Sequence, residues 1–245
     1  MDIKSPFEGI KTYDKYWKLW ALTAGLVLLH FPVVLLIIFV EKWLYLDFTA
    51  IEANIPMQVV IGLAALSVLS DLGVSWRAAL ADWRARFLPD AVKALKYFGG
   101  YLLVLGGVVA VALAAYLAFG ETAVESSIQP MLSKGTEEGA MLRTAAASPL
   151  RMIFSVFGVC VVAPVVEELF FRRIFYTTVR ARHGFWFSAF WSGLFFALAH
   201  GASAPALLPV GMYFCWVYER ERRLPVNILL HSLINALMIA VRLNI

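Results

Sequence analysis

Long apolar runs separated by short polar connections dominate the sequence. A helix needs roughly 20 apolar residues to cross the hydrocarbon core of a bilayer, and two of the runs, the fifth and the sixth, are short by that standard. The predicted spans are Lys18 to Val40, Pro56 to Trp76, Tyr97 to Phe119, Met152 to Arg172 with a helical extension towards Val179, Phe185 to His200, Leu207 to Tyr218, and Pro225 to Leu243. We therefore expect an all-α fold, a polytopic membrane helical bundle with about seven to eight transmembrane helices.

Composition supports the same fold class. Hydrophobic residues make up 61% of the chain and charged residues 16%, whereas soluble domains have roughly 45 to 50% and 25%. No polar stretch is long enough to fold as a separate soluble domain, so we predict one integral membrane domain over residues 1–245. Residues 1–150 are expected to form the amino-terminal spans and an interfacial helix, and residues 151–243 the motif-bearing core.

Positive charge is concentrated in the connections between the spans. The formal net charge is +4, but membrane orientation explains this distribution better than nucleic-acid binding, so the predicted partner is the lipid bilayer and no nucleic acid. Connections rich in Lys and Arg usually face the cytoplasm, which places the amino terminus there. The basic residues on which this orientation rests are Lys4, Lys11, Lys15 and Lys18; Arg77, Arg84, Arg86, Lys93 and Lys96; Arg172, Arg173, Arg180 and Arg182; and Arg220, Arg222 and Arg223.

Two connections have a predicted structure of their own. Trp76, Leu80, Trp83 and Phe87 recur at helical spacing, which predicts an amphipathic helix. This helix either lies in the cytoplasmic interface or packs on the bundle as a connector. The segment from Gly120 to Leu150 has no clear periodicity, and we expect an extracytoplasmic loop with room for a short helix.

Three ionisable residues interrupt the fourth span: Glu167, Glu168 and Arg172. Each charge at mid-membrane depth costs about 2.5 to 3.5 kcal/mol, so a cluster of such groups indicates a functional site. Glu168 and Arg172 are four residues apart and share one helix face, which predicts a mutually compensating, supporting pair. Glu167 points about 100° away and has no local partner, which suits a general base acting on water. The alternative is that both glutamates only brace the bundle.

Further polar residues lie in the last spans. His200 ends the fifth run, and His231 and Asn235 share one face of the seventh. A carboxylate, imidazoles and a carboxamide together supply a base, a proton carrier and hydrogen-bond donors for an oxyanion, which are the groups that amide hydrolysis by water needs.

The order and spacing of these groups resemble those of a known family. Glu167-Glu168-x-x-x-Arg172, then Phe196-x-x-x-His200, then His231-x-x-x-Asn235 are similar to the successive motifs of the CPBP or ABI family of intramembrane proteases, which includes the type II CAAX prenyl endopeptidases. The resemblance covers roughly Arg151 to Leu243. It implies that Glu167 activates the hydrolytic water with help from His200, that His231 and Asn235 bind the oxyanion, and that Glu168 and Arg172 support the site.

Positions along the helix axes give a depth for the site. Glu167 lies about 7 Å from Arg172, and His231 about 9 Å from Pro225, both near the predicted cytoplasmic side. His200 lies about 22 Å from Phe185, which fits only if that span starts in an interfacial aromatic belt and ends within the membrane. On these grounds we predict an active-site cavity that opens towards the cytoplasm.

Four hypotheses remain open at this point. The first is a glutamic-type endopeptidase without a cofactor, cleaving near the carboxyl terminus of a prenylated CAAX-type or other membrane-tethered protein or peptide. The second is a zinc protease with Glu167, His200 and His231 as ligands, because a carboxylate with two imidazoles is an established zinc set, although HExxH is absent. The third is a proton- or solute-coupled transporter, and the fourth, related possibility is a catalytically silent scaffold.

Overall fold

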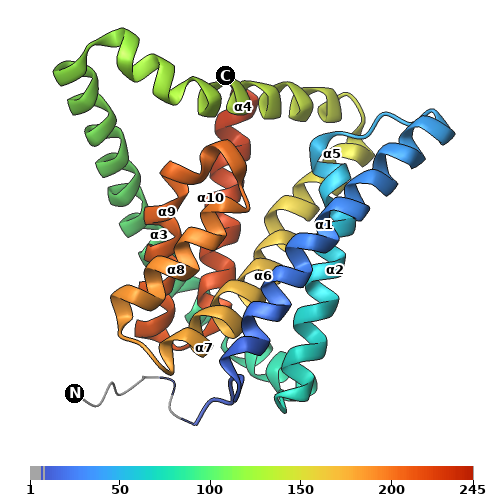
Figure 1. Cartoon of the computed structure of the whole chain (residues 1–245), viewed down its shortest axis with the longest axis vertical. Helices are drawn as coiled ribbons and strands as arrows, with labels where there is room; N and C mark the ends of the chain where they lie inside the picture. The colour runs from blue at the N-terminus through green and yellow to red at the C-terminus, as the bar shows by residue number, and fades with distance from the viewer. Residues whose placement is uncertain (1–6, 8, 245) are drawn as a thin grey trace.

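The chain folds into a bundle of helices (Figure 1). The computed structural model describes Phe7 and residues 9–244, and no strand occurs among them. This confirms the predicted fold class. The helices are α1 (Tyr16–Leu44), α2 (Ala50–Asp71), α3 (Trp76–Phe119), α4 (Glu121–Ala146), α5 (Pro149–Phe157), α6 (Ala163–Glu167), α7 (Thr177–Arg180), α8 (Phe185–Leu198), α9 (Ala204–Glu221) and α10 (Leu224–Asn244).

Each predicted span corresponds to a helix of the bundle. In the part of the chain that the structure describes, five helical stretches are long and apolar enough to cross a membrane: Tyr16–Leu44, Ile51–Asp71, Trp76–Phe119, Pro149–Arg180 and Leu224–Asn244. The fifth predicted span is the shorter apolar helix α8, and the sixth is α9. The protein is therefore an integral membrane protein.

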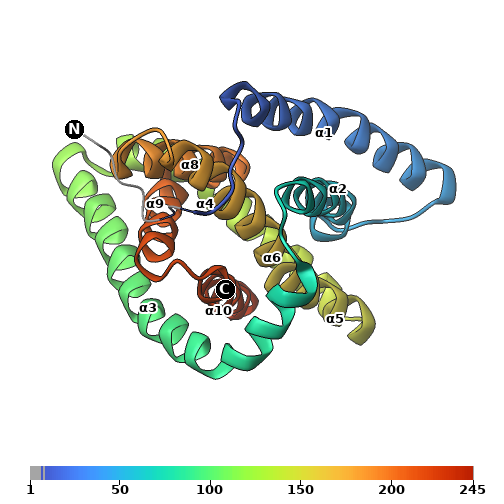
Figure 2. The ribbon, with the colours of Figure 1, turned by 90° about the horizontal axis from the view of Figure 1, so that it is seen from below.

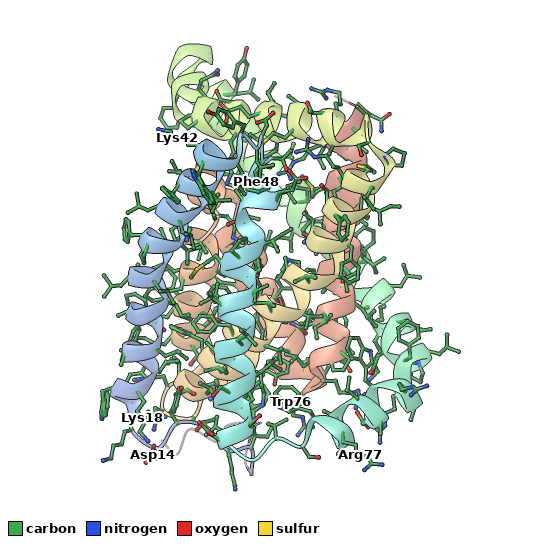
Figure 3. The ribbon with its side chains drawn as sticks, turned by 90° about the vertical axis from the view of Figure 1, so that its right-hand side faces the viewer. Asp14, Lys18, Lys42, Phe48, Trp76 and Arg77 are labelled. Atoms are coloured by element: carbon green, nitrogen blue, oxygen red, sulfur yellow. The ribbon has the colours of Figure 1, made fainter. Side chains whose placement is uncertain are left out.

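The outer surface of the bundle is apolar along most of its length. Leu28, Phe31 and Leu35 on α1 are each more than 60% exposed, as lipid-facing side chains must be. Figure 3 shows apolar side chains along α1 between Lys18 at one end of the bundle and Lys42 at the other. Arg77 lies at the same end as Lys18. Charged groups thus flank an apolar belt.

The predicted amphipathic helix and the third span form one helix, α3. Its backbone departs from helical geometry at Arg86 (φ −115°, ψ 15°), and the two parts run in different directions (Figure 2). Leu80 and Phe87 of the first part are exposed, which favours a helix in the membrane interface over a packed connector. After the kink, the buried Asp90 accepts two hydrogen bonds of 2.7 Å from Arg223, which anchors α3 to the turn between α9 and α10.

The prediction of a loop from Gly120 to Leu150 is wrong. This segment forms the 26-residue helix α4, which crosses one end of the bundle close to the carboxyl terminus (Figure 1). Ionic contacts hold it together with a short buried stripe of Gly139, Leu142 and Ala145, which is too brief for hydrophobic periodicity to reveal the helix. Its Arg143 donates a 3.2 Å hydrogen bond from Nη1 to the backbone carbonyl of Arg242 in α10.

Helices α8 and α9 form a tight hairpin. A Cβ atom added to Gly211 would lie 2.8 Å from the Cα of Gly193 and 3.2 Å from the ring of Phe196. Only glycine at both positions permits this approach. The hairpin brings the end of α8 back into the bundle and places the carbonyl of Gly211 within reach of Arg172.

Gly211→Ala is expected to lower the free energy of unfolding by about 1 to 3 kcal/mol, because the new methyl group meets backbone atoms that cannot move freely. Thermal unfolding in detergent, followed by circular dichroism, measures the effect. Gly106→Ala is the matched control, since a Cβ there meets nothing within 4 Å. Equal midpoints for the two variants would show that the hairpin is not close-packed.

Candidate functional site

The two glutamates lie on a helix with an unusual backbone. From Pro149 to Arg180 the chain is continuously helical, but Gly158–Val162 and Glu168–Tyr176 adopt π-helical hydrogen bonding. Glu167 is the last residue of the single α-helical turn between them, α6. Short π segments inside α-helices occur frequently at functional sites, where they change the direction of side chains.

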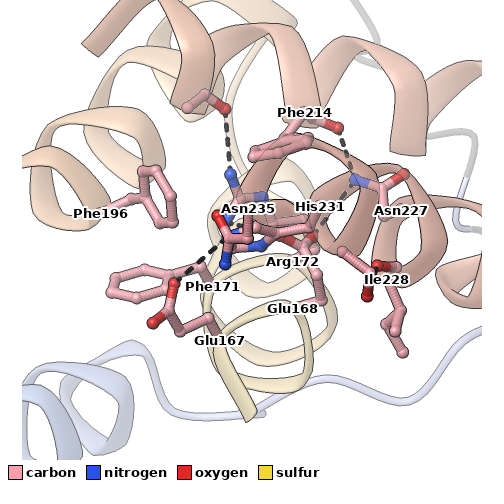
Figure 4. Close-up of polar contacts among 12 residues, drawn as sticks. Glu167, Glu168, Phe171, Arg172, Phe196, Phe214, Asn227, Ile228, His231 and Asn235 are labelled. Carbon is pink, nitrogen blue, oxygen red and sulfur yellow. Dashed lines mark hydrogen bonds and ion pairs between the residues drawn. The ribbon is translucent and has the colours of Figure 1, made fainter. Parts of the chain in front are cut away.

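Glu167 faces three neighbouring helices with one of its carboxylate oxygens free. Oε1 accepts a 3.1 Å hydrogen bond from Nε2 of Gln58 in α2. Oε2 is buried and has no hydrogen-bond partner among the described residues. It lies 3.8 Å from Nε2 of His231 (Figure 4). It lies 4.0 Å from Nε2 of His200. These separations exceed a direct hydrogen bond and suit a water bridge.

His200 presents its Nε2 atom to the site. The residue follows the end of α8, and its Nδ1 lies 2.7 Å from the carbonyl oxygen of Phe196, one turn earlier. A carbonyl only accepts hydrogen bonds, so Nδ1 carries the proton and the Nε2 of a neutral ring has a free lone pair. The side chain is 31% exposed, more than those of Glu167 (12%) and His231 (5%).

His231 is held between the two glutamates. Its Nδ1 lies 3.0 Å from Oε1 of Glu168, and its Nε2 faces Glu167. The ring packs 4.9 Å from that of Phe214. Because the Glu168 carboxylate accepts the Nδ1 proton, Nε2 carries a hydrogen only in the doubly protonated form of the ring.

Glu168 and Arg172 form the fully buried ionic centre of the bundle. Both side chains are 0% exposed, and Nη1 of Arg172 lies 3.3 Å from Oε1 of Glu168. The guanidinium group lies between the rings of Phe196 and Phe214, at 4.5 Å and 4.8 Å from their centroids. Its Nη2 donates a 3.4 Å hydrogen bond to the carbonyl of Gly211. Aromatic faces and a backbone carbonyl thus surround a cation that has no access to water.

The structure places Asn235 on the same face of α10 as His231 but gives its amide a backbone partner. Nδ2 donates a 2.8 Å hydrogen bond to the carbonyl of Val159 in the first π segment. The amide has a second N–H, which this bond does not use. Asn235 therefore joins α10 to the helix of Glu167, and one donor remains for another acceptor.

Two polar residues of the site were missed in the sequence. Gln58 binds Glu167, and Asn227 donates hydrogen bonds to Oε2 of Glu168 (3.2 Å) and to the carbonyl of Phe214 (2.9 Å). Both left a signal. Each is an isolated amide in an apolar run, and Asn227 lies four residues before His231, on the face that also carries Asn235.

Within the described part of the chain, no three His, Cys, Asp or Glu side chains are arranged to hold a metal ion. The site that the structure does assemble contains five of the sequence-predicted groups within ion-pair distance of a neighbour: Glu167, Glu168, Arg172, His200 and His231. The sixth, Asn235, lies on α10 one turn after His231 and is bonded to the helix of Glu167.

Comparison with known proteins agrees with the resemblance predicted from the motifs. Residues 149–237 match the family model described as "Type II CAAX prenyl endopeptidase Rce1-like", a range that contains all six predicted site residues. Over 107 residues, the chain is 29% identical to a Bacillus subtilis (strain 168) protein named "Putative membrane peptidase YdiL". That alignment covers 43% of this chain and 42% of the relative. No solved structure matches the chain significantly.

The resemblance to type II CAAX prenyl endopeptidases is therefore confirmed over the segment that builds the site. Both similarities support the prediction that the protein is a membrane protease.

Arg172→Met is expected to destabilise the fold by about 3 to 5 kcal/mol, because it leaves the buried Glu168 carboxylate without its cation. The double variant Glu168→Gln with Arg172→Met removes both charges and should lose less. Thermal unfolding in detergent gives both values. Lys18→Met, which removes an exposed i,i+4 pair with Asp14, is the control and should change little. A double variant less stable than Arg172→Met would contradict the pairing.

Proposed function

We propose that this protein is an intramembrane glutamic-type endopeptidase that hydrolyses a peptide bond of a membrane-associated protein or peptide. The observation that carries the proposal is the free Oε2 of Glu167, buried and facing the Nε2 atoms of two histidines. An unpartnered buried carboxylate oxygen is costly, and a general base is one of the few roles that needs it.

In the proposed reaction, Glu167 takes a proton from a water molecule while the water oxygen attacks the carbonyl carbon of the scissile bond. The carbonyl oxygen becomes an oxyanion, which accepts hydrogen bonds from Nε2–H of protonated His231 and from the second N–H of Asn235. The C–N bond then breaks, and the amine nitrogen receives the proton that Glu167 accepted, carried by His200. No atom other than those of water and the peptide enters the products.

The surroundings of the two imidazoles support different roles for them. His231 is held by the Glu168 carboxylate through Nδ1 and is almost fully buried, and we assign it the donor function. His200 binds a backbone carbonyl through Nδ1 and is partly exposed, and we assign it the acceptor function at Nε2. A proton acceptor and a proton donor then approach the same carboxylate oxygen of Glu167.

The substrate proposal rests on the family match. A prenylated CAAX-type protein or peptide, tethered to the bilayer, is the substrate class that the resemblance favours. With the amino terminus in the cytoplasm, as the positive charges indicate, we propose that access to Glu167 is from the same side, where the carboxyl-terminal end of such a substrate would enter.

Glu167→Gln is expected to lower kcat on prenylated CAAX peptides by about 100- to 10,000-fold, because the amide cannot accept the proton of water. Cleavage of prenylated and unprenylated peptides by purified protein in liposomes gives the rate and tests the substrate class together. Glu41→Gln, at the far end of α1, is the matched control. A folded Glu167→Gln protein that cleaves at the wild-type rate would refute the mechanism.

Chelation tests the requirement for a metal. We expect activity to survive removal of divalent metal by a strong chelator, because the proposed reaction uses only protein groups and water. Metal analysis of the purified protein accompanies the assay. Loss of activity that zinc restores, with one zinc per chain, would instead favour Glu167, His200 and His231 as zinc ligands.

A further inference from the structure

Helix α4 contacts the candidate site through one lysine. The ammonium group of Lys134 donates a hydrogen bond to the backbone carbonyl of His200. His200 follows the end of α8 at Leu198 and precedes the 3-10 turn Gly201–Ser203, so this hydrogen bond fixes the backbone of the turn that joins α8 to α9. A charged donor binds the carbonyl more strongly than a neutral one.

The same part of α4 is attached to α10. Glu138, one turn after Lys134, lies 3.8 Å from the Lys134 ammonium through Oε1 and 2.5 Å from Nη2 of Arg242 through Oε2. Arg143 adds a hydrogen bond to the carbonyl of Arg242. An ionic chain therefore runs from the carbonyl of His200 through α4 to the end of α10.

We propose that Lys134 is a positioning residue that sets the place of His200 relative to Glu167 and His231. The proposal rests on the proposed peptidase function of the site. The ring of His200 is fixed to its own helix by the bond from Nδ1 to the carbonyl of Phe196. Its Nε2 can therefore move relative to the other helices only together with the end of α8.

Lys134 holds that end at the backbone carbonyl of His200. Helix α10 carries His231 and Asn235, and Arg242 links this helix to Glu138. The chain from Lys134 to Arg242 thus joins the two elements whose histidines approach the same oxygen of Glu167. A displacement of about 1 Å at a catalytic group can lower a rate about 100-fold, so this attachment has consequences for the reaction.

The test compares Lys134→Met, which keeps the length of the side chain and removes its donors, with Lys134→Arg, which retains a cation. Lys42→Met is the matched control, because Lys42 is exposed at the end of α1. Hydrogen exchange of the amides of residues 199–204, measured by mass spectrometry on the full-length protein in liposomes, reports the position of the turn without any substrate. Cleavage kinetics of the peptide used for Glu167→Gln report the reaction.

Lys134→Met is expected to increase amide exchange at residues 199–204 about tenfold and to lower kcat at least about tenfold, with KM within about twofold of the wild-type value. Lys134→Arg should restore most of both, and Lys42→Met should change neither. Unchanged exchange at the turn, or a loss of kcat that Lys42→Met shares, would overturn the proposal. If Lys134→Met does not fold, Lys134→Gln, which keeps one short donor, is held to the same criteria.

The two readouts separate this inference from the proposed function. If Glu167→Gln leaves cleavage unchanged, the peptidase mechanism fails, and the exchange experiment still shows whether Lys134 holds the turn. If Glu167→Gln abolishes cleavage while Lys134→Met has wild-type kcat, the mechanism stands and the role of Lys134 is wrong.

Discussion

The carboxylate of Glu168 is the interaction on which the rest of the structure depends. It is fully buried and forms an ion pair with Arg172 on its own helix. It also accepts hydrogen bonds from His231 and Asn227 on α10. A buried anion without these partners would be more costly than an apolar side chain of the same size. The buried guanidinium group of Arg172 in turn needs partners of its own. The faces of Phe196 and Phe214 and the carbonyl of Gly211 provide them. The burial of this charge thus constrains how α8 and α9 pack against the helix that carries Glu168 and Arg172.

Two adjacent glutamates acquire different properties because their partners differ in charge. Glu168 lies beside a guanidinium group and is committed to it and to two further donors. Glu167 receives only the neutral amide of Gln58 and keeps an oxygen without a hydrogen bond. The π-helical segments before and after α6 change the direction in which successive side chains point. Glu167 and Glu168 can therefore face different surroundings. Glu168, which supports His231, and Glu167, the proposed base that faces it, are therefore consecutive residues.

Spacing within a helix made part of the site predictable. Residues four apart share a face whatever the tertiary structure, so the pair of Glu168 with Arg172 and the common face of His231 and Asn235 could be inferred directly. Contacts between helices depend on rotation and depth, which the sequence does not specify, so the bond from Gln58 to Glu167 was not foreseen. Helix α4 was missed for another reason. Its ionic contacts join distant positions in the chain, such as Glu138 with Arg242, and its buried apolar side chains, Leu142 and Ala145, are too few to form a hydrophobic period.

The shortness of α8 explains why a polar helix lies across the end of the bundle. With 14 residues, α8 is about 21 Å long and ends before it could cross the hydrocarbon core. Backbone groups that end inside a bundle need partners from the protein, because lipid offers none. The His200 carbonyl finds that partner in Lys134, whose charge is balanced by Glu138. A helix that stops at mid-depth can thus bring an imidazole to Glu167 only if another element closes the space beyond it, and α4 occupies that position.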